Sequence, residues 1–298
     1  MDLSFDAELE ALVTATADWC RAHLPLEASR ARPAGLWDDL VAMGWTTMTA
    51  PDGMALDHAS ETMVFAELGR HLAPVALLSS AVASRWGGAS GKVALALVEG
   101  GIARVFDCDG AGHALGLTES GAGVAALPAG LRGEPGLDLS APMALLAPAP
   151  AFATLDEPRV ALHLQLLVSA FAVGCAEAAC VMAASYAQVR EQFERPIGWF
   201  QAIKHLCADM AVRTAAARAQ LCYAAGALDA DDGEAAFHIA AARHLAVQAA
   251  LENGRANIQV HGGIGMTDEA YPHLCLKRAH FLSFIAPADR AILLGQAA

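Results

Sequence analysis

Two polar segments of the sequence carry residue types and spacings that suit a phosphate group. The first segment, Tyr186–His205, places Arg190 and Gln192 at the expected end of a helix, directly before an Arg-Pro-Ile-Gly turn. A guanidinium is a planar fork of hydrogen-bond donors and matches a phosphate or diphosphate. A cation at a helix C-terminus also stabilises the helix dipole, and for Arg190 taken alone this structural role is the favoured interpretation.

The second segment, Ile258–Thr267, contains three glycines in the four positions that follow His261. Glycine lacks a Cβ atom, so the backbone at Gly262 and Gly263 can approach a ligand closely. A helix C-cap followed by a tight turn would use the same glycines. We expect His261 itself to be structural.

Motifs for several other chemistries are missing from the sequence. It contains no P-loop, no G-x-G-x-x-G after a predicted strand, no G-x-S-x-G and no H-E-x-x-H. The 7 cysteines include no pair at C-x-x-C spacing. We therefore expect free, mostly buried thiols in a reducing cytoplasm, and neither a disulfide framework nor a metal site.

The composition predicts a folded protein without a nucleic-acid partner. Of the 298 residues 55% are hydrophobic and 17% are charged, which excludes a disordered chain. The formal net charge of −13 opposes binding to phosphate backbones, because such binding needs a basic surface. No run approaches 18 uninterrupted apolar residues, so we expect no membrane span. The acidic start of the sequence lacks the basic region of a signal peptide, which favours a cytoplasmic location.

The elements that must position the two polar segments begin with a helical region. Apolar side chains at helical spacing predict helices over residues 5–24 and 36–43. Ser60 is expected to cap a third helix. The exposed face of this third helix is expected to carry three charged side chains: Glu61, Glu67 and Arg70.

Strands follow this helical region, and long helices follow the strands. Short apolar runs split by glycines predict strands at 92–98, 102–107, 113–118 and 123–127. After a proline-rich exit, Ala-rich periodic segments predict helices at 159–191, 200–229, 234–260 and 269–284. The expected fold is mainly α, with an N-terminal helical domain (1–88), a reduced middle β region (89–155) and a C-terminal four-helix bundle (156–298).

Taken together and in this order, the two polar segments resemble the C-terminal domain of the acyl-CoA dehydrogenase family. The resemblance extends through Asp209 and Met210 and through the run His273–Ala279. Upstream, Leu36–Trp45 and Glu67–Arg70 resemble the family's N-terminal helical domain. The family oxidises acyl-CoA thioesters between Cα and Cβ with FAD. The resemblance therefore implies the same fold, substrate class and cofactor.

The resemblance also implies that the bundle binds the adenine and diphosphate end of FAD across a subunit interface. Arg190 would contact the diphosphate, and Phe193 would pack near the adenosine. Gln201 matches a family glutamine at the same corner, and Gln192 belongs to the same polar group. The remaining expected contacts would reach the diphosphate through a side chain and through the backbone, and they are Gln259, Gly262 and Gly263.

The sequence departs from the family pattern in its middle region. It is dozens of residues shorter than ordinary members, and the shortfall lies between the predicted strands. Ala96–Gly101 resembles a remnant of a stretch that contacts the flavin in the family. Leu117–Gly123 is similar to the same motif, but its position fits a turn between late strands. In this chain the pocket around the flavin ring would therefore lack much of the wall that the β region forms in the family.

The catalytic base of the family is also missing. Members hold a Glu either in a loop that reads here as residues 284–288 or early in the first long helix, at 162–165, and neither segment contains a carboxylate. His163 is a conceivable substitute one position away. We expect no catalytic residue in this chain, because removal of an α-proton depends on a positioned base.

Short members of this kind resemble the β-type subunits of heteromeric acyl-CoA dehydrogenases that act on steroid side chains. The resemblance implies a full-length acyl-CoA dehydrogenase partner in an α2β2 hetero-oligomer, an FAD shared across the interface, an acyl-CoA substrate and an electron-transfer flavoprotein as acceptor. A self-sufficient homo-oligomeric dehydrogenase with an unusual base, and a flavin-free structural paralogue, remain as alternatives.

Overall fold

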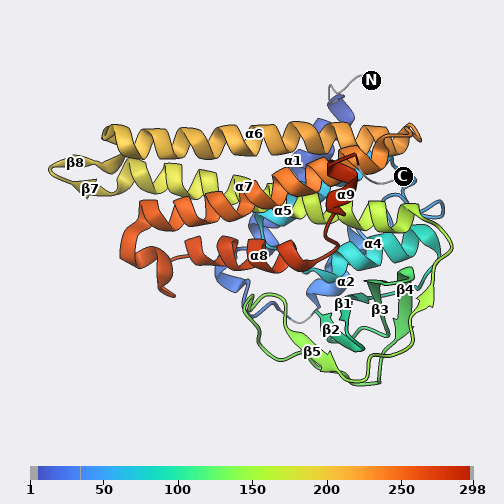
Figure 1. The fold of residues 1–298 in the computed structure, drawn as a ribbon. Helices are drawn as coiled ribbons and strands as arrows, with labels where there is room; N and C mark the ends of the chain where they lie inside the picture. Colours follow the sequence, from blue (N-terminus) through green and yellow to red (C-terminus); the bar gives the residue numbers. More distant parts are fainter. Residues whose placement is uncertain (1–5, 34, 296–298) are drawn as a thin grey trace.

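Four helices form the C-terminal part of the chain, and three of them are rich in alanine and are the longest helices of the described residues (Figure 1). The computed structural model describes residues 6–33 and 35–295. The bundle consists of α5 (Arg159–Val189), α6 (Gln201–Asp229), α7 (Ala235–His261) and α8 (Pro272–Phe284), and a short α9 (Arg290–Leu293) follows. The predicted bundle is confirmed, although α8 begins three residues later than expected, at Pro272.

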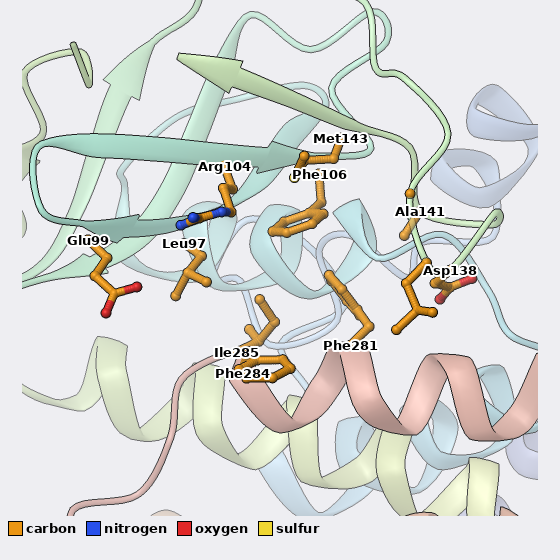
Figure 2. Close-up of a pocket in the computed structure, with 12 residues that line it drawn as sticks. Leu97, Glu99, Arg104, Phe106, Asp138, Ala141, Met143, Phe281, Phe284 and Ile285 are labelled. Carbon is orange, nitrogen blue, oxygen red and sulfur yellow. The ribbon is translucent and has the colours of Figure 1, made fainter. Parts of the chain in front are cut away.

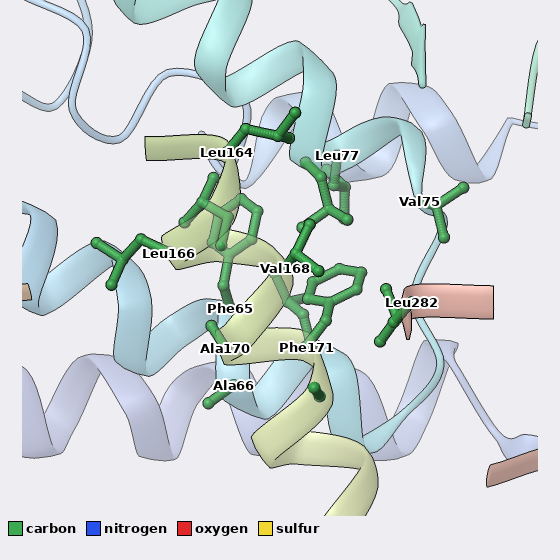
Figure 3. Packing of buried hydrophobic residues seen from close by; sticks show 14 of the residues in the cluster. Phe65, Ala66, Val75, Leu77, Leu164, Leu166, Val168, Ala170, Phe171 and Leu282 are labelled. Carbon is green, nitrogen blue, oxygen red and sulfur yellow. The ribbon is translucent and has the colours of Figure 1, made fainter. Parts of the chain in front are cut away.

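Helix α5 is the central helix of the fold. By length and composition it could cross a membrane, but 78% of its most apolar 18-residue window is buried inside the protein. It packs against α3 (His58–Arg70), and a Cβ atom on Gly174 would overlap the carbonyl oxygen of Ala66. The rings of Phe65 and Phe171 pack at this crossing, as Figure 3 shows. The apolar character of α5 is therefore explained by its place in the core.

The N-terminal part contains α1 (Ala7–His23), the short 3-10 helix η1 (Leu26–Ala28), α2 (Leu36–Ala42), α3 and α4 (Ala76–Trp86). The three predicted helices are present, but α4 was not predicted. Phe5, the first residue of the predicted N-terminal helix, lies outside the described residues. The N-cap of α3 is Asp57, whose carboxylate accepts a hydrogen bond from the amide of Ser60, so the prediction of Ser60 as N-cap is wrong.

The predicted exposed face of α3 is also wrong. The side chains of Glu61 and Glu67 are buried, and Arg70 is half-buried. Helix α3 packs against α1, α5 and α6, so it lies between the N-terminal helices and the bundle and has little solvent-facing surface. The spacing of charged residues along a helix cannot reveal that the helix is enclosed, because a prediction from such spacing takes charged side chains to face water.

A six-stranded sheet lies beside α4 and the end of α8 (Figure 1). Its strands are β1 (Val93–Glu99), β2 (Ile102–Phe106), β3 (His113–Thr118), β4 (Gly121–Ala126), β5 (Met143–Leu146) and β6 (Ala153–Thr154), in the order β5-β2-β1-β3-β4-β6. All neighbours are antiparallel except β1 and β3. The four predicted strands are confirmed, and the proline-rich exit adds the two edge strands that the sequence did not reveal.

The turn between β3 and β4 contains the segment that resembles the flavin-contacting motif. Thr118 pairs with Gly121 at the end of this hairpin, and the Thr118 hydroxyl donates to the Gly121 carbonyl at 2.9 Å. The segment is therefore a hairpin turn, as its position predicted. The main hydrophobic core runs continuously from the N-terminal helices through the sheet to the bundle. The division at residues 88 and 155 stays a prediction.

Candidate functional site

The first predicted segment forms the connection between α5 and α6. Helix α5 ends at Val189, and a two-stranded hairpin of β7 (Glu191–Gln192) and β8 (Arg195–Pro196) leads into a 3-10 turn, η2 (Ile197–Trp199). The two turn residues of the hairpin, Phe193 and Glu194, have φ angles of 54° and 64°. The Phe193 side chain is 83% exposed. The hairpin therefore presents an aromatic ring to solvent at the end of the bundle.

The second predicted segment is a glycine turn at the end of α7. Gly262 has a φ of 67° and starts a 3-10 turn, η3 (Gly262–Met266). A Cβ atom on Gly265 would lie 3.0 Å from the Cβ atom of His261, so packing explains that glycine. A Cβ atom on Gly263 would have no heavy atom within 4 Å. Nothing in the described part of the chain requires a glycine at 263, and the open backbone there can accept a ligand or a partner.

A stacked pair of rings holds the two segments together. Tyr186 and His261 lie with ring centroids 4.1 Å apart and planes inclined by 21°. The amide of Arg190 donates to the carbonyl of Tyr186 at 2.9 Å, and Gly262 directly follows His261. Burial lowers the pKa of His261, and the hydrogen bond between its Nδ1 and the Asn257 carbonyl partly opposes this shift. The structure thus brings the ends of α5 and α7 together.

We call residues 186–201 and 257–267 the bundle tip. All seven predicted cofactor-binding residues lie in it and are exposed: Arg190, Gln192, Phe193, Gln201, Gln259, Gly262 and Gly263. The Gln192 side chain donates to the Glu191 carbonyl at 2.7 Å, and the Arg190 guanidinium has no ion-pair partner within the described residues. An unpaired guanidinium and open glycine backbone on two segments joined at the same end of the bundle fit a diphosphate. The individual roles of the seven residues stay predictions.

The two segments in which the family holds its base meet in this fold. The Gln165 side chain on α5 donates to the carbonyl oxygen of Pro287, after α8, at 3.1 Å. Arg243 on α7 holds the intervening loop, because its buried guanidinium donates to the carbonyls of Leu282 and Ile285, the latter at 2.7 Å. Burial lowers the pKa of Arg243 to about 10. No carboxylate stands at either position, and Ala286 is buried with a φ of 44°.

His163, the conceivable substitute base, is fully buried and held on both ring nitrogens. The indole N–H of Trp86 donates to Nδ1 at 3.1 Å, and Nε2 lies 2.6 Å from the Glu61 carboxylate. An indole nitrogen is only a donor, so Nδ1 carries no proton and Nε2 donates to Glu61. The lone pair that a base would need is already in use, and no substrate can reach it.

Sequence reasoning missed a cavity of about 410 Å³ between the sheet and the end of α8 (Figure 2). We call it the sheet cavity. Leu97 and Glu99, from the segment that resembles a flavin-contacting remnant, line one side, and Phe284 and Ile285 line the other. The remaining lining residues come from the sheet, from the loop before β5 and from α8, and they are Arg104, Phe106, Gly136, Leu137, Asp138, Ala141, Met143 and Phe281. The segments lie far apart in the sequence, so no local pattern signals the cavity.

The comparisons with known proteins agree with this architecture. Residues 161–286 match the family model described as the C-terminal domain of acyl-CoA dehydrogenase. The bundle is therefore similar to the C-terminal domain of acyl-CoA dehydrogenases. Acyl-CoA dehydrogenase FadE34 of Mycobacterium tuberculosis is 44% identical over 115 residues, which are 38% of this chain and 16% of that protein. Acyl-CoA dehydrogenase IpdE2 of the same organism is 38% identical over 137 residues, 46% of this chain and 41% of that protein. The matches thus span less than half of either relative.

Solved structures show the acyl-CoA dehydrogenase fold over almost the whole chain. Butyryl-CoA dehydrogenase from Megasphaera elsdenii superposes with a TM-score of 0.80 at 17% identity, covering 99% of this chain and 98% of that one. A chain of the ChsE4-ChsE5 complex from Mycobacterium tuberculosis superposes with a TM-score of 0.74 at 23% identity, covering 99% and 96%. A chain of the Tcur3481-Tcur3483 steroid acyl-CoA dehydrogenase variant gives a TM-score of 0.76 at 22% identity, covering 97% and 96%.

Proposed function

We propose that this chain is the non-base-carrying subunit of a heteromeric, FAD-dependent acyl-CoA dehydrogenase, and that it completes the FAD site of a full-length partner subunit. The observation that carries the proposal is the contact between Gln165 and Pro287. It joins the residues that directly follow the two positions at which the family would hold its base, Leu164 and Ala286, and neither position carries a carboxylate.

Removal of an α-proton from an acyl-CoA needs a positioned base, and such a group accelerates the step by roughly 10²–10⁴-fold. The amide of Gln165 accepts no proton at neutral pH, and its Nε2 is engaged with the Pro287 carbonyl. Ala286 offers a methyl group, and His163 is sealed between Trp86 and Glu61. The base must therefore come from another subunit.

The bundle tip supplies groups that fit the other end of the cofactor. When bound, FAD accepts the hydride from the β-carbon of the acyl group. Arg190 would neutralise the diphosphate, the backbone at Gly262 and Gly263 would approach it, and Phe193 would cover the adenosine. Gln192, Gln201 and Gln259 would donate or accept hydrogen bonds around it.

The exposed side chains of the tip support an interface with another subunit. Val189, Phe193 and Trp199 are large, apolar and mostly exposed at this end of the bundle. Several large apolar side chains exposed at one end of a bundle favour a site that a partner covers. Two of the similar solved structures are described as two-component assemblies, and one as a steroid enzyme. A full-length partner in an α2β2 cytoplasmic complex, a steroidal acyl-CoA and an electron-transfer flavoprotein as acceptor are the proposed assembly.

The test is co-expression of this chain with full-length acyl-CoA dehydrogenases of the same genome, followed by measurement of bound flavin. Arg190→Ala should lower FAD affinity roughly 10- to 100-fold, since it removes a charge-assisted contact of about 1.5–3 kcal/mol. The matched control is Arg21→Ala, on the exposed side of α1. Equal flavin occupancy in the Arg190→Ala and parent complexes would contradict the proposed FAD contact.

Turnover tests the assignment of the base. The purified chain, given FAD, an acyl-CoA and an artificial electron acceptor, should show no activity. Activity should appear with the partner and disappear when the partner's catalytic Glu is replaced by Gln. Turnover by the single chain would instead support the self-sufficient enzyme, and a complex that never binds flavin would support the structural paralogue.

A further inference from the structure

His261 is the last residue of α7, and its imidazole is held in place at the bundle tip, the end that carries β7 and β8 (Figure 1). The ring stacks on Tyr186 of α5, and Nδ1 lies 2.9 Å from the carbonyl oxygen of Asn257. A carbonyl oxygen is only an acceptor, so Nδ1 carries the proton of the neutral ring and the lone pair is on Nε2. The two contacts thus set both the plane of the imidazole and its tautomer.

The second ring nitrogen of His261, Nε2, is open to solvent. Among the described residues this atom forms no hydrogen bond and no ion pair, and it is not one of the buried polar atoms. Protonation would place an N–H donor and a positive charge on Nε2 without breaking the bond between Nδ1 and the Asn257 carbonyl. The ring can therefore gain a proton while it keeps its position.

The end of α7 is unfavourable for an anion as long as this ring is neutral. The last carbonyls of a helix carry partial negative charge, and α7 ends at His261. Gly262 and Gly263, where the diphosphate is proposed to bind, follow directly, and a Cβ atom on either would meet no heavy atom within 4 Å. A protonated imidazole would oppose the charge of the helix end and could donate a charge-assisted hydrogen bond to the diphosphate.

The titratable side chains around His261 direct no free charge toward it. Tyr186 of α5 lies against the ring. In the segment after α7, Asp268 forms an ion pair with Arg30. The apolar cluster that contains Tyr186 also contains three thiols on α5, α6 and α8, and burial raises the pKa of each, so they are uncharged at neutral pH: Cys180, Cys207 and Cys275.

The charge of the ring is therefore set by burial and by the ligand. Burial lowers the pKa of His261 below its ordinary value, the Asn257 carbonyl partly opposes this shift, and no charged side chain of the described residues contributes to it. A bound anion would favour the charged ring and raise its pKa, and by linkage the protonated ring binds the anion more tightly. The gain in affinity is complete below the pKa of the free chain and is lost as the pH rises through the raised pKa of the complex.

We propose that His261 is a further diphosphate contact of the bundle tip, and that protonation of its Nε2 makes the tip bind the cofactor more tightly as the pH falls. This inference rests on the proposed function, because it concerns the same diphosphate site, and it adds regulation by pH to that site. His261 acts as a binding residue and takes no part in the removal of a proton from the substrate.

The test measures the affinity of the purified chain for ADP-ribose by titration calorimetry between about pH 5 and about pH 8, the range in which histidines titrate. ADP-ribose contains the adenosine and diphosphate of FAD, and its diphosphate is esterified at both ends, so the charge of the probe stays constant over this range. The parent should bind about 10-fold more tightly at the acid end. His261→Phe keeps an aromatic ring beside Tyr186 but cannot be protonated, so at every pH it should bind with the affinity that the parent has at the alkaline end. His261→Gln repeats the measurement with a smaller neutral side chain.

His205 provides the matched control, because it is exposed in the first turns of α6 at the same end of the bundle. His205→Phe should keep the full pH dependence, and Arg190→Ala should lower the affinity by the same factor at both ends of the range. Equal parent affinity at both ends, a pH dependence that survives in both His261 variants, or its loss in His205→Phe would each overturn the proposal while the proposed function stands. If the parent binds no ADP-ribose at any pH, the diphosphate site fails and this proposal fails with it.

Discussion

The buried ion pair between Arg278 and Asp138 joins three parts of the fold, and its removal should reveal how strongly they depend on one another. Arg278, on α8, is fully buried, and the Asp138 side chain is only 5% exposed. The Arg278 guanidinium also donates to the carbonyl of Ala73 at 2.9 Å and to the hydroxyl of Ser140 at 2.6 Å. The pair thus connects the bundle, the turn between α3 and α4, and the loop before β5.

The expected magnitude follows from burial. Removal of one member of a buried pair leaves an uncompensated charge and costs about 3–5 kcal/mol. Asp138→Leu and Arg278→Met should each lower the free energy of unfolding by this amount. The double variant leaves no unpaired charge in the core. Replacement of a buried ion pair by well-packed apolar side chains often leaves the free energy of unfolding unchanged. It should therefore be more stable than either single variant.

Urea unfolding followed by circular dichroism measures these effects as a double-mutant cycle. At an m-value of roughly 3 kcal/mol/M, the midpoint of each single variant should fall by about 1–2 M. The control is Asp18→Ala, which breaks the exposed pair with Arg21 and should change stability by less than about 1 kcal/mol. Additive effects of the two single replacements, or a loss no larger than in the control, would refute the reasoning.

Two further predictions concern other connections of the fold. Burial opposes the charged form of Asp229, but hydrogen bonds from the side chain and amide of His58 and from the amide of Ala59 outweigh it and lower the pKa below 3.8. Asp229→Asn should lower the free energy of unfolding by about 1.5–3 kcal/mol at pH 7. Because the pKa of Asp229 is lowered in the folded protein, this difference in stability between parent and variant, measured by urea unfolding, should disappear as the pH falls below 3.8 and the carboxylate is protonated. Replacement of Phe193 and Glu194 by Asn and Gly should raise the free energy of unfolding by about 1–2 kcal/mol, because the φ angles at both positions are positive and suit Asn-Gly in a two-residue hairpin turn. Flavin retention in the complex should fall at the same time, and a lower urea midpoint would contradict this prediction.

The sequence by itself determined the order of the elements and the long helices of the bundle. Apolar and alanine residues recur at helical spacing in this part of the sequence, and such a pattern involves only residues within a few helical turns of one another. The ends of α5, α6 and α7 therefore lie within two residues of their predicted positions. The two polar segments were also visible, because Arg190 and the glycines after His261 stand at helix ends. Their common location at one end of the bundle agrees with the resemblance.

Only the tertiary structure decided which charged groups face water and where cavities form. Glu61 has the spacing of a surface residue, yet α3 is enclosed by other helices. The buried Glu61 carboxylate instead accepts a hydrogen bond from Nε2 of His163, 102 residues away. Strand β5 forms only because its partner β2 offers an unpaired edge, and this pairing across about forty residues of chain leaves no local signal. The same strand pairing places Arg104 opposite Leu145 on an apolar face of the sheet. Local periodicity reports the intrinsic preference of a segment, whereas burial and charge pairing depend on contacts between segments that are distant in sequence.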